Sequence, residues 1–347
     1  MRPEDLGYRP EMAKELGGLE PGRIIAEHRE RYIIISSRGE SEAEITGNMR
    51  FTARSRLDLP VVGDWVGLVL YDAGPALIHK ILPRTSVLTR QSAGQKSELQ
   101  PIAANIDTAF LVQAADRDFS LNRLERYLTL CNTAGVKAVV VLTKTDLAGE
   151  ARVQELGARV NERIPGVPVV SISNASREGY EKILPFLEKG KTCCMLGSSG
   201  VGKSSLMNNL SGRELMKTGS LSASTNKGKH VTSHRELIVL ENGALLIDNP
   251  GMREVGITDE AGGLEQTFDR IGAFGKHCKY QDCTHTSEAG CAVTEAVRKG
   301  EIDPGAYENY LRMEKERRFL EASLEERRRK EREFGRMMKN YKKGRGE

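Results

Sequence analysis

The stretch GSSGVGKS, residues 197–204, decides the fold of this 347-residue chain. Its glycines at 197, 200 and 202 free the backbone to curl so that successive N–H groups point at phosphate oxygens, and a helix starting at Lys203 would add its positive end. The apolar run TCCML precedes the stretch, and the helical run SSLMNNL overlaps its end. This order of strand, loop and helix predicts a phosphate-binding loop, for which a chance glycine-rich turn is the alternative.

The loop residues have different expected roles. Lys203 would supply a mobile cation for the outer phosphates, and the hydroxyl of Ser204 would be a ligand of Mg²⁺ bridging those phosphates. The loop residues predicted to contact the nucleotide are Gly197, Ser198, Ser199, Gly200, Val201, Gly202, Lys203, Ser204 and Ser205. The loop by itself predicts a nucleoside triphosphate and does not identify the base.

Asp248 opens the stretch DNPG, residues 248–251, directly after the apolar run ALLI. A carboxylate at such a strand end can hold Mg²⁺ through water, and the N–H of Gly251 would lie near a γ-phosphate. An ordinary strand-to-loop turn is the alternative for so short a motif. We expect Asp248 and Gly251 to belong to the same nucleotide site as the loop.

The stretch TKTD, residues 143–146, follows the buried-strand run VVVL and predicts the reader of the base. Asp146 can accept hydrogen bonds from guanine N1–H and its 2-amino group, whereas adenine would leave the carboxylate unpaired. Lys144 would lie along the base, and Thr143 stands where Asn is commoner. In SISN, residues 171–174, Ser173 and Asn174 form a plausible second clamp on the base, through the backbone after Ser173. Such short motifs recur by chance, so each of them supports a nucleotide site only in combination with the others.

The base reader precedes the phosphate loop by about fifty residues, and no comparable motif follows residue 251. The order along the chain is therefore a circular permutation of the usual one. A compact domain tolerates this change because its ends are often close and the site depends on spatial convergence.

The pattern of apolar residues changes along the chain. Short apolar or alternating runs from about 22 to 90 predict a small β-barrel or sandwich. After about 101, buried-strand runs alternate with helical periodicity, which predicts an α/β domain with a parallel sheet. Residues 262–300 are weakly periodic, so we expect them to need something other than a hydrophobic core to fold. A charged helix is predicted from 307 onward.

These motifs resemble those of the bacterial small ribosomal subunit biogenesis GTPases, which are circularly permuted and activated by the ribosome. The resemblance covers nearly the whole chain and also rests on KGKHVTSHREL at 227–237, MRE after DNPG, and CKYQDCTHTSEAGC at 278–291. It implies a GTP hydrolase in late maturation of the small (30S) subunit. Such an enzyme would bind the subunit and its rRNA in the GTP state, be stimulated there, and leave on hydrolysis.

The resemblance also implies the domain organisation. The α/β GTPase domain, with a mainly parallel sheet, would be flanked by an OB-fold barrel and a mostly helical zinc-binding domain. The expected divisions are an N-terminal extension at 1–20, the RNA-binding barrel at 21–95, the GTPase domain at 96–260, the zinc-binding domain at 261–305, and a basic C-terminal helix or tail at 306–347.

The polar stretch 227–237 lies between the phosphate loop and Asp248, where a mobile switch belongs. We expect Thr232 to be the Mg²⁺ ligand that orders this switch when GTP is bound. Val231 stands where the family usually has another Thr, and Ser233 offers a competing hydroxyl.

Met252 follows DNPG, where many GTPases have a Gln that orients the attacking water. A thioether cannot do this, so another group positions the water or intrinsic turnover is very slow. The resemblance points to His230 as the catalytic residue. The alternatives are that His230 is a surface residue touching RNA, or that His234 takes its place.

Cys278, Cys283, His285 and Cys291 have the spacing C-x4-C-x-H-x5-C. Three thiolates and an imidazole suit a closed tetrahedral Zn²⁺ site with a structural role, one ion per chain. Scattered reduced cysteines are one alternative, and His277 as the fourth ligand is another. The remaining cysteines, Cys131, Cys193 and Cys194, fall in apolar stretches and are expected in the core.

The stretch GNMRFTARSR, residues 47–56, reads as a strand whose alternation sends Met49, Phe51 and Ala53 to one face. Arg50, Arg54 and Arg56 would then share the other face with Thr52 and contact RNA phosphates. A solvated edge is the alternative, and the resemblance favours RNA. Between 327 and 345, ten basic residues against two acidic ones leave cations suited to ribosomal RNA.

A net charge of +4 is too small to name a partner. The chain has no apolar run of membrane-spanning length and no secretory signal, so we expect a cytoplasmic protein without a membrane partner. We also expect a monomer. Two other functions remain open. One is a GTP-gated RNA-binding module whose hydrolysis is incidental, and the other is an ATPase or small-molecule kinase, which conflicts with Asp146.

Overall fold

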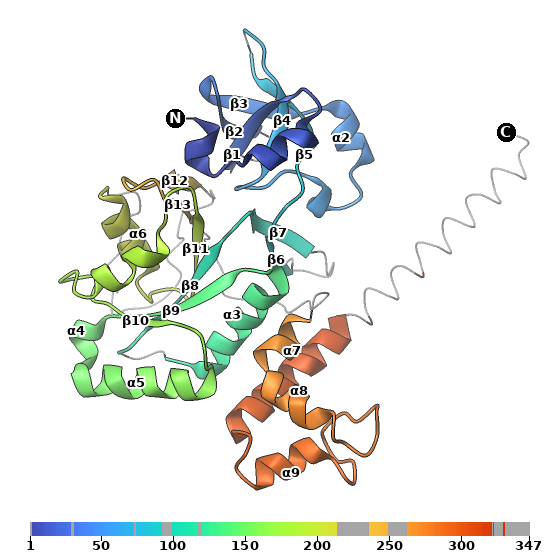
Figure 1. The fold of residues 1–347 in the computed structure, drawn as a ribbon, viewed down its shortest axis with the longest axis vertical. Coiled ribbons are helices and arrows are strands. Elements are labelled where there is room, and N and C mark those ends of the chain that lie inside the picture. The colour runs from blue at the N-terminus through green and yellow to red at the C-terminus, as the bar shows by residue number, and fades with distance from the viewer. Residues whose placement is uncertain are drawn as a thin grey trace, which may run out of the picture.

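The computed structural model describes residues 2–28, 31–72, 74–91, 99–116, 119–213, 236–248 and 262–320, together with residues 322 and 329. A β-barrel and a C-terminal helical module lie at opposite ends of a central domain built on a β-sheet (Figure 1). The predictions made for His230, Thr232 and Gly251, and for most of the basic run at 327–345, fall outside the described residues.

The N-terminal part is the predicted barrel. Its strands close in the order β1-β2-β3-β5-β4, and all neighbours are antiparallel except β3 and β5. The strands are β1 (Glu20–His28), β2 (Arg31–Ser36), β3 (Gly39–Ile45), β4 (Trp65–Val69) and β5 (Ala76–Ile81). Ile24, Ile34, Val66 and Ile78 are completely buried inside the barrel. Alternation of apolar side chains along each strand fills this interior.

The prediction of a strand over residues 47–56 is wrong. Residues Gly47–Thr52 form helix α2, and Arg56–Asp58 form a 3-10 turn, η3. The hydroxyl of Thr46 accepts a hydrogen bond from the N–H of Met49 at 3.2 Å and so caps α2. Helical geometry separates side chains two positions apart, so Phe51 does not join Met49 on the core side and is 91% exposed.

The first residues of the chain pack between the barrel and the central sheet. They form η1 (Pro3–Leu6), η2 (Pro10–Met12) and α1 (Ala13–Leu16). Leu6 is completely buried, and the ring of Tyr8 stands edge-on to Trp65 with centroids 5.2 Å apart. Asp5 forms an ion pair with Lys189 at 3.0 Å. This segment therefore ties the barrel to the sheet.

Arg23 of β1 is a buried cation at the junction of barrel and sheet. Its guanidinium donates to the carbonyl of Leu6, to the carbonyl of Asn105 at 3.4 Å and to the hydroxyl of Thr192 at 2.7 Å. Burial lowers its pKa to about 10, with Asp107 and Asp64 opposing the shift. The same strand makes a backbone bridge from Ala26 to Glu236, at the start of the last pair of strands in the sheet.

The central domain is the predicted α/β unit. Its six strands run in the order β10-β9-β8-β11-β13-β12, and only β12 is antiparallel to its neighbour. They are β8 (Thr108–Ala114), β9 (Lys137–Thr143), β10 (Val169–Ser171), β11 (Thr192–Leu196), β12 (Leu237–Val239) and β13 (Leu245–Ile247). The main helices are α3 (Leu121–Ala134), α4 (Thr145–Ala148), α5 (Glu150–Arg163) and α6 (Lys203–Ser211). Strands β6 (Val87–Gln91) and β7 (Leu99–Ala104) pair separately, and short turns η4 (Tyr180–Lys182) and η5 (Leu184–Phe186) precede β11.

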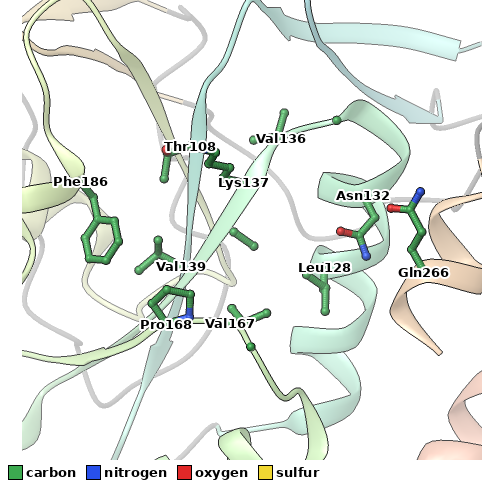
Figure 2. A pocket seen from close by; sticks show the side chains of 13 residues that line it. Thr108, Leu128, Asn132, Val136, Lys137, Val139, Val167, Pro168, Phe186 and Gln266 are labelled. Atoms are coloured by element: carbon green, nitrogen blue, oxygen red, sulfur yellow. The ribbon is translucent and has the colours of Figure 1, made fainter. Parts of the chain in front are cut away.

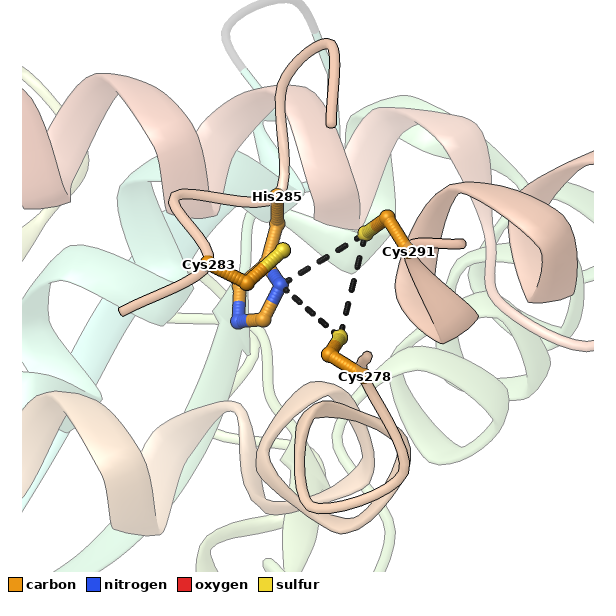
Figure 3. A group of neighbouring side chains, drawn as sticks. All are labelled: Cys278, Cys283, His285 and Cys291. Atoms are coloured by element: carbon orange, nitrogen blue, oxygen red, sulfur yellow. Dashed lines mark hydrogen bonds between the residues drawn. The ribbon is translucent and has the colours of Figure 1, made fainter. Parts of the chain in front are cut away.

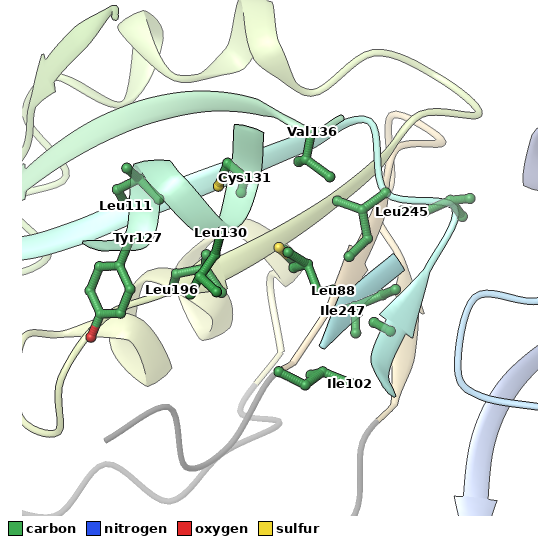
Figure 4. Close-up of a cluster of buried hydrophobic side chains, with 14 of the residues drawn as sticks. Leu88, Ile102, Leu111, Tyr127, Leu130, Cys131, Val136, Leu196, Leu245 and Ile247 are labelled. Carbon is green, nitrogen blue, oxygen red and sulfur yellow. The ribbon is translucent and has the colours of Figure 1, made fainter. Parts of the chain in front are cut away.

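Two apolar clusters cover the two faces of the sheet. Cys194 and Leu196 of β11 join Cys131 of α3 in one cluster, which Figure 4 draws in part. Their neighbours Cys193 and Met195 join the other cluster, as alternation along a strand requires. Cys131, Cys193 and Cys194 are thus core residues, as predicted.

The C-terminal module has its own small core, and the expectation that it lacks one is wrong. Its helices are α7 (Gly263–Thr267), α8 (Asp269–Gly275) and α9 (Ala292–Arg298), and residues 304–320 are also helical. Leu264, Phe268, Ile271, Val293 and Met313 are buried together. Met313 comes from the charged helix, so a residue beyond 262–300 also contributes to this core.

Helix α3 is the surface on which this module docks. Glu125 of α3 is 2% exposed and accepts hydrogen bonds from Arg163 at 2.7 Å and from Asn309 at 2.6 Å. A Cβ added to Gly263 would lie 2.2 Å from the hydroxyl oxygen of Thr133, so only glycine permits this approach. Among the described residues, no helix is long and apolar enough to cross a membrane.

Candidate functional site

The predicted phosphate loop lies between β11 and α6. The strand ends at Leu196 and the helix begins at Lys203, as the sequence indicated. Gly202 has φ of 95°, and a Cβ there would lie 2.6 Å from the side-chain nitrogen of Asn174. A Cβ on Gly197 would lie 2.4 Å from the carbonyl oxygen of Val112. Glycine is therefore required at both positions by the closeness of neighbouring residues.

Polar side chains hold the first residues of the loop. Lys203 Nζ donates to the carbonyl oxygens of Gly197 and Ser198 at 2.7 and 2.6 Å. The hydroxyl of Ser198 accepts a hydrogen bond from Arg123 Nη1 of α3 at 3.1 Å. The lysine ammonium therefore lies at the loop itself, where an anion bound by the loop would meet it.

The motifs that are predicted to read the base lie against the predicted phosphate loop. Thr143 Oγ1 donates to the carbonyl oxygen of Val201 at 2.5 Å, although 58 positions separate the two residues. Asn174 Nδ2 donates to the carbonyl oxygen of Gly202 at 3.0 Å. The motifs TKTD, SISN and GSSGVGKS thus meet at the carboxyl edge of the parallel sheet, where open α/β sheets bind ligands.

Ser173 holds the carboxylate that is expected to read the base. Its hydroxyl donates to Asp146 Oδ1 at 2.7 Å and accepts from the N–H groups of Ala175 and Ser176, both at 3.2 Å. Lys144, with φ of 57°, turns the chain from β9 into α4, whose first turn carries Asp146. Lys144 Nζ lies 3.4 Å from Asp116 Oδ2. The sequence indicated a backbone role for Ser173, whereas its side chain also orients Asp146.

The structure reveals supporting residues that the sequence did not indicate. Tyr180 OH donates to Asn174 Oδ1 at 2.8 Å, and Asn209 of α6 donates to the carbonyl oxygen of Asn174 at 2.9 Å. Neither residue belongs to a motif. Arg123, which contacts Ser198, lies in a helix whose pattern predicts only an amphipathic surface. No local signal could have found these three residues, because their partners are distant in the sequence.

Asp248 follows β13, at the strand end where it was predicted. It is 9% exposed, and its N–H donates to the carbonyl oxygen of Glu236 at 3.1 Å. Burial raises the pKa of its carboxyl to about 6, while Lys203 lowers it and Glu236 raises it. A buried carboxylate whose charge is poorly compensated fits a site for a cation.

The four predicted metal ligands form one cluster. Their ligand atoms all lie within 4.8 Å of one another. The sulfurs of Cys278 and Cys291 are 3.9 Å apart, and His285 Nδ1 lies 3.5 Å from the first and 3.6 Å from the second (Figure 3). Cys283 completes the set. Within the part of the chain that the structure describes, His277 does not belong to this cluster. These four residues could hold a metal ion.

Neighbouring side chains shape the loop that carries the cluster. The carboxylate of Glu288 accepts hydrogen bonds from the N–H groups of Thr284 at 2.8 Å and Thr286 at 3.0 Å. Hydrogen bonds from Thr284 and from backbone N–H groups lower the pKa of Glu288 to about 2. His285 has φ of 61°, and Tyr307 OH donates to its carbonyl oxygen at 2.7 Å. The sequence did not indicate Glu288 or Tyr307.

The three predicted RNA-contacting arginines do not share one strand face. Arg50 lies in α2 and Arg54 follows it, and both are exposed. Arg56 is partly buried and forms an ion pair with Glu27 of β1. Burial lowers the pKa of Arg56. The arginines at 50 and 54 are therefore the better placed of the three for contact with a partner.

A pocket of about 500 Å³ lies at the other edge of the sheet (Figure 2). Val136 and Lys137 at the start of β9, Pro168 before β10, and Phe186 help to line it. It is open to solvent near the amino ends of the strands. It contains none of the motif residues and is separate from the site described above.

Comparison with known proteins relates the chain to one family. A family model described as RsgA GTPase matches residues 81–258. A protein of Opitutus terrae named small ribosomal subunit biogenesis GTPase RsgA is 41% identical, over 86% of this chain and 84% of that protein. The crystal structure of YjeQ from Thermotoga maritima has a TM-score of 0.63 and 28% identity, covering 86% of this chain and 98% of that one. The structure of YloQ, titled a circularly permuted GTPase, has a TM-score of 0.63 and 27% identity, covering 87% and 96%.

Proposed function

The chain belongs to the RsgA GTPase family, and we propose that it hydrolyses GTP on the small ribosomal subunit during late maturation and leaves the subunit after hydrolysis. The observation that carries this function is the pair of hydrogen bonds from Thr143 and Asn174 to the phosphate loop. These bonds hold the proposed guanine reader and the proposed phosphate cradle at one sheet edge. GTP is thereby favoured over ATP, because Asp146 has no matching donors on adenine.

The nucleotide residues have distinct proposed roles. Asp146 accepts hydrogen bonds from the guanine base, with Ser173 fixing its orientation. Lys203 and the loop N–H groups bind the phosphates. The full proposed set is Thr143, Lys144, Asp146, Ser173, Asn174, Gly197, Ser198, Ser199, Gly200, Val201, Gly202, Lys203, Ser204, Ser205, Asp248 and Gly251.

We assign Mg²⁺ to Ser204, Thr232 and Asp248, the last through water. The raised pKa of the buried Asp248 supports this assignment, because a nearby cation would favour the charged carboxylate. When bound with GTP, Mg²⁺ supplies charge that offsets the negative phosphates during transfer. Asp248 directly follows β13 and Ser204 lies in α6, so the central domain fixes the positions of both groups.

His230 is the proposed catalytic residue, positioning the attacking water. Met252 cannot do so because its thioether is a poor hydrogen-bonding group. If hydrolysis were only incidental to GTP-gated RNA binding, a His230→Ala protein would cycle on and off its RNA normally. We expect instead that this variant binds the small subunit with GTP and is released slowly.

The cysteine cluster is proposed to bind one structural Zn²⁺. Bond lengths of about 2.3 Å to sulfur and 2.0–2.1 Å to nitrogen in a tetrahedron require about 3.8 Å between sulfurs and about 3.5 Å between sulfur and nitrogen. The sulfurs of Cys278 and Cys291 are 3.9 Å apart, His285 Nδ1 lies 3.5 and 3.6 Å from them, and all four ligand atoms, including that of Cys283, lie within 4.8 Å of one another. Cys278, Cys283, His285 and Cys291 use all four positions, so the site has a structural purpose.

The proposed partners are the small ribosomal subunit and its rRNA. Arg50, Arg54 and Arg56 of the barrel and the basic run at 327–345 would contact rRNA phosphates. A cytoplasmic monomer fits this function. We propose domain boundaries that divide the chain into residues 1–20, 21–95, 96–260, 261–305 and 306–347. Met313, from the last of these segments, contributes to the core of the C-terminal module.

Measurement of GTP turnover with and without isolated small subunits tests this function. We expect strong stimulation by small subunits, none by large subunits, and a decrease as salt rises, because counterions compete with the cationic contacts. Absence of stimulation at low salt would contradict action on the small subunit. A response independent of salt would contradict the phosphate contacts.

A further inference from the structure

We propose that Phe51, on the barrel helix α2, is a stacking platform for one unpaired RNA base. This inference rests on the proposed binding of rRNA. It goes further by naming the residue and the kind of nucleotide that it takes. The proposal rests on the observation that residues Gly47–Thr52 form a helix and not the predicted strand. The helix directs the ring of Phe51 to solvent, whereas a strand would have directed it to the core.

The exposure of Phe51 is extreme and local. The side chain is 91% exposed, more than the other large apolar side chains that the structure describes as exposed, such as Phe319 at 74% and Tyr71 at 50%. Met49 is partly buried against the barrel core from the same helix. The helix is therefore anchored on one side, while Phe51 presents a rigid ring to solvent on the other.

Cationic residues flank Phe51 in the sequence. Arg50 and Arg54 are exposed, and the segment 46–56 contains no acidic residue. The nearest downstream carboxylate, Asp58, accepts hydrogen bonds from the N–H groups of Arg54 at 2.9 Å and Ser55 at 2.8 Å. Asp58 thus holds the turn after α2, and its charge also acts on Arg54. The segment therefore exposes an aromatic ring with an exposed arginine on either side of it in the sequence.

Single-stranded RNA matches this arrangement better than a duplex or a protein surface. An unpaired base offers a flat π face for the ring, and the phosphates on either side of it offer charges for the arginines. In an A-form duplex the base faces are stacked inside and cannot reach Phe51. An apolar patch on a protein would not make use of the flanking cations.

The first test measures affinity for isolated small subunits at several salt concentrations. Phe51→Ala should weaken binding about 5- to 150-fold, the range for one stacked base. The slope of affinity against salt should not change, because stacking releases no counterion. Arg50→Gln and Arg54→Gln should instead each reduce the slope by about 1. Phe319→Ala, which removes an exposed ring elsewhere, is the matched control and should leave the affinity for small subunits unchanged.

Two further substitutions separate stacking from plain hydrophobic contact. Phe51→Leu keeps an apolar side chain without a π face and should bind as weakly as Phe51→Ala, whereas Phe51→Trp should retain affinity. Wild-type affinity in Phe51→Leu would overturn the proposal in favour of an apolar protein contact. Wild-type affinity in Phe51→Ala would overturn it outright.

The second test uses fluorescence and a defined probe. The native chain has one tryptophan, Trp65, which is 2% exposed. In F51W the introduced indole is the exposed emitter, and a single-stranded RNA oligonucleotide should quench it. A duplex of the same length should not, and equal quenching by the two would overturn the proposal. Failure of the wild-type protein to bind small subunits would contradict the proposed function, while the oligonucleotide comparison would still decide the role of Phe51.

Discussion

The hydroxyl of Thr143 lies 2.5 Å from the carbonyl oxygen of Val201, so the residue that opens the motif proposed to read the base is bonded to the backbone of the proposed phosphate loop. Thr143 is completely buried, and its oxygen also lies 3.3 Å from the carbonyl oxygen of Gln113. A hydroxyl has one hydrogen, so the shorter contact with Val201 receives it. Thr in place of the commoner Asn therefore still joins the two halves of the site.

Removal of this hydroxyl should loosen the loop. Thr143→Val keeps the shape but leaves the buried carbonyl of Val201 without its donor, at a cost of about 1–3 kcal/mol in the free energy of unfolding. We expect urea denaturation to detect this loss and GTP to bind about tenfold more weakly. Thr143→Ser, which keeps the donor, should bind GTP like the wild-type protein. Equal GTP affinity in Thr143→Val would contradict a role for this bond.

Substitution of Asp146 should change the base that is bound. Asp146→Asn offers a donor where guanine also has a donor, so GTP should bind at least tenfold more weakly and xanthine nucleotides should be preferred. Ser173→Ala is the companion variant. It should weaken GTP binding less and leave the preference for guanine, because it removes only the group that orients the carboxylate. Competition binding with labelled GDP measures both effects, and unchanged GTP affinity in Asp146→Asn would refute the assignment.

The buried carboxyl of Asp248 should make the stability of the protein without nucleotide or Mg²⁺ depend on pH. Its pKa is raised to about 6 from an ordinary 3.8, mainly by burial. Between these values the unfolded chain is ionised while the folded protein keeps its proton, so the free energy of unfolding decreases as pH rises through this window and is level above it. The total decrease is at most about 3 kcal/mol.

Asp248→Asn isolates this contribution. We expect the variant to be more stable than the wild-type protein at pH 7.5, with the difference shrinking towards pH 4.5, in chemical denaturation without Mg²⁺. The same variant should lose Mg²⁺-dependent GTP binding. A stability difference that is the same at the two pH values would contradict the raised pKa.

Metal removal should unfold the C-terminal module locally. Chelation should release one zinc per chain and make the segment at 276–291 sensitive to protease, because its loop depends on the metal.

Tyr307→Phe removes the hydrogen bond to the carbonyl of His285, and we expect about tenfold weaker metal binding. Tyr280→Phe, a change at a 45% exposed position in the same loop, is the control. Equal zinc affinity in the two variants would show that Tyr307 does not support the site.

Contiguous residues were enough to predict the phosphate loop, the sheet strands beside it, the permuted order of motifs and the cysteine cluster. The loop, the strands and the cysteine cluster depend on local periodicity or spacing, and the permuted order is the order of the motifs along the chain, so all of them can be read directly from the sequence. Tertiary structure alone decided the partners: Thr143 with Val201, Ser173 with Asp146, and Met313 with the core of the C-terminal module. It also decided the helix at 47–52, where the cap at Thr46 overrides an alternating pattern and turns Phe51 outward. The partner pairs follow from packing between distant segments, whose energies no local pattern contains, whereas the helix has a local cap that the alternating pattern conceals.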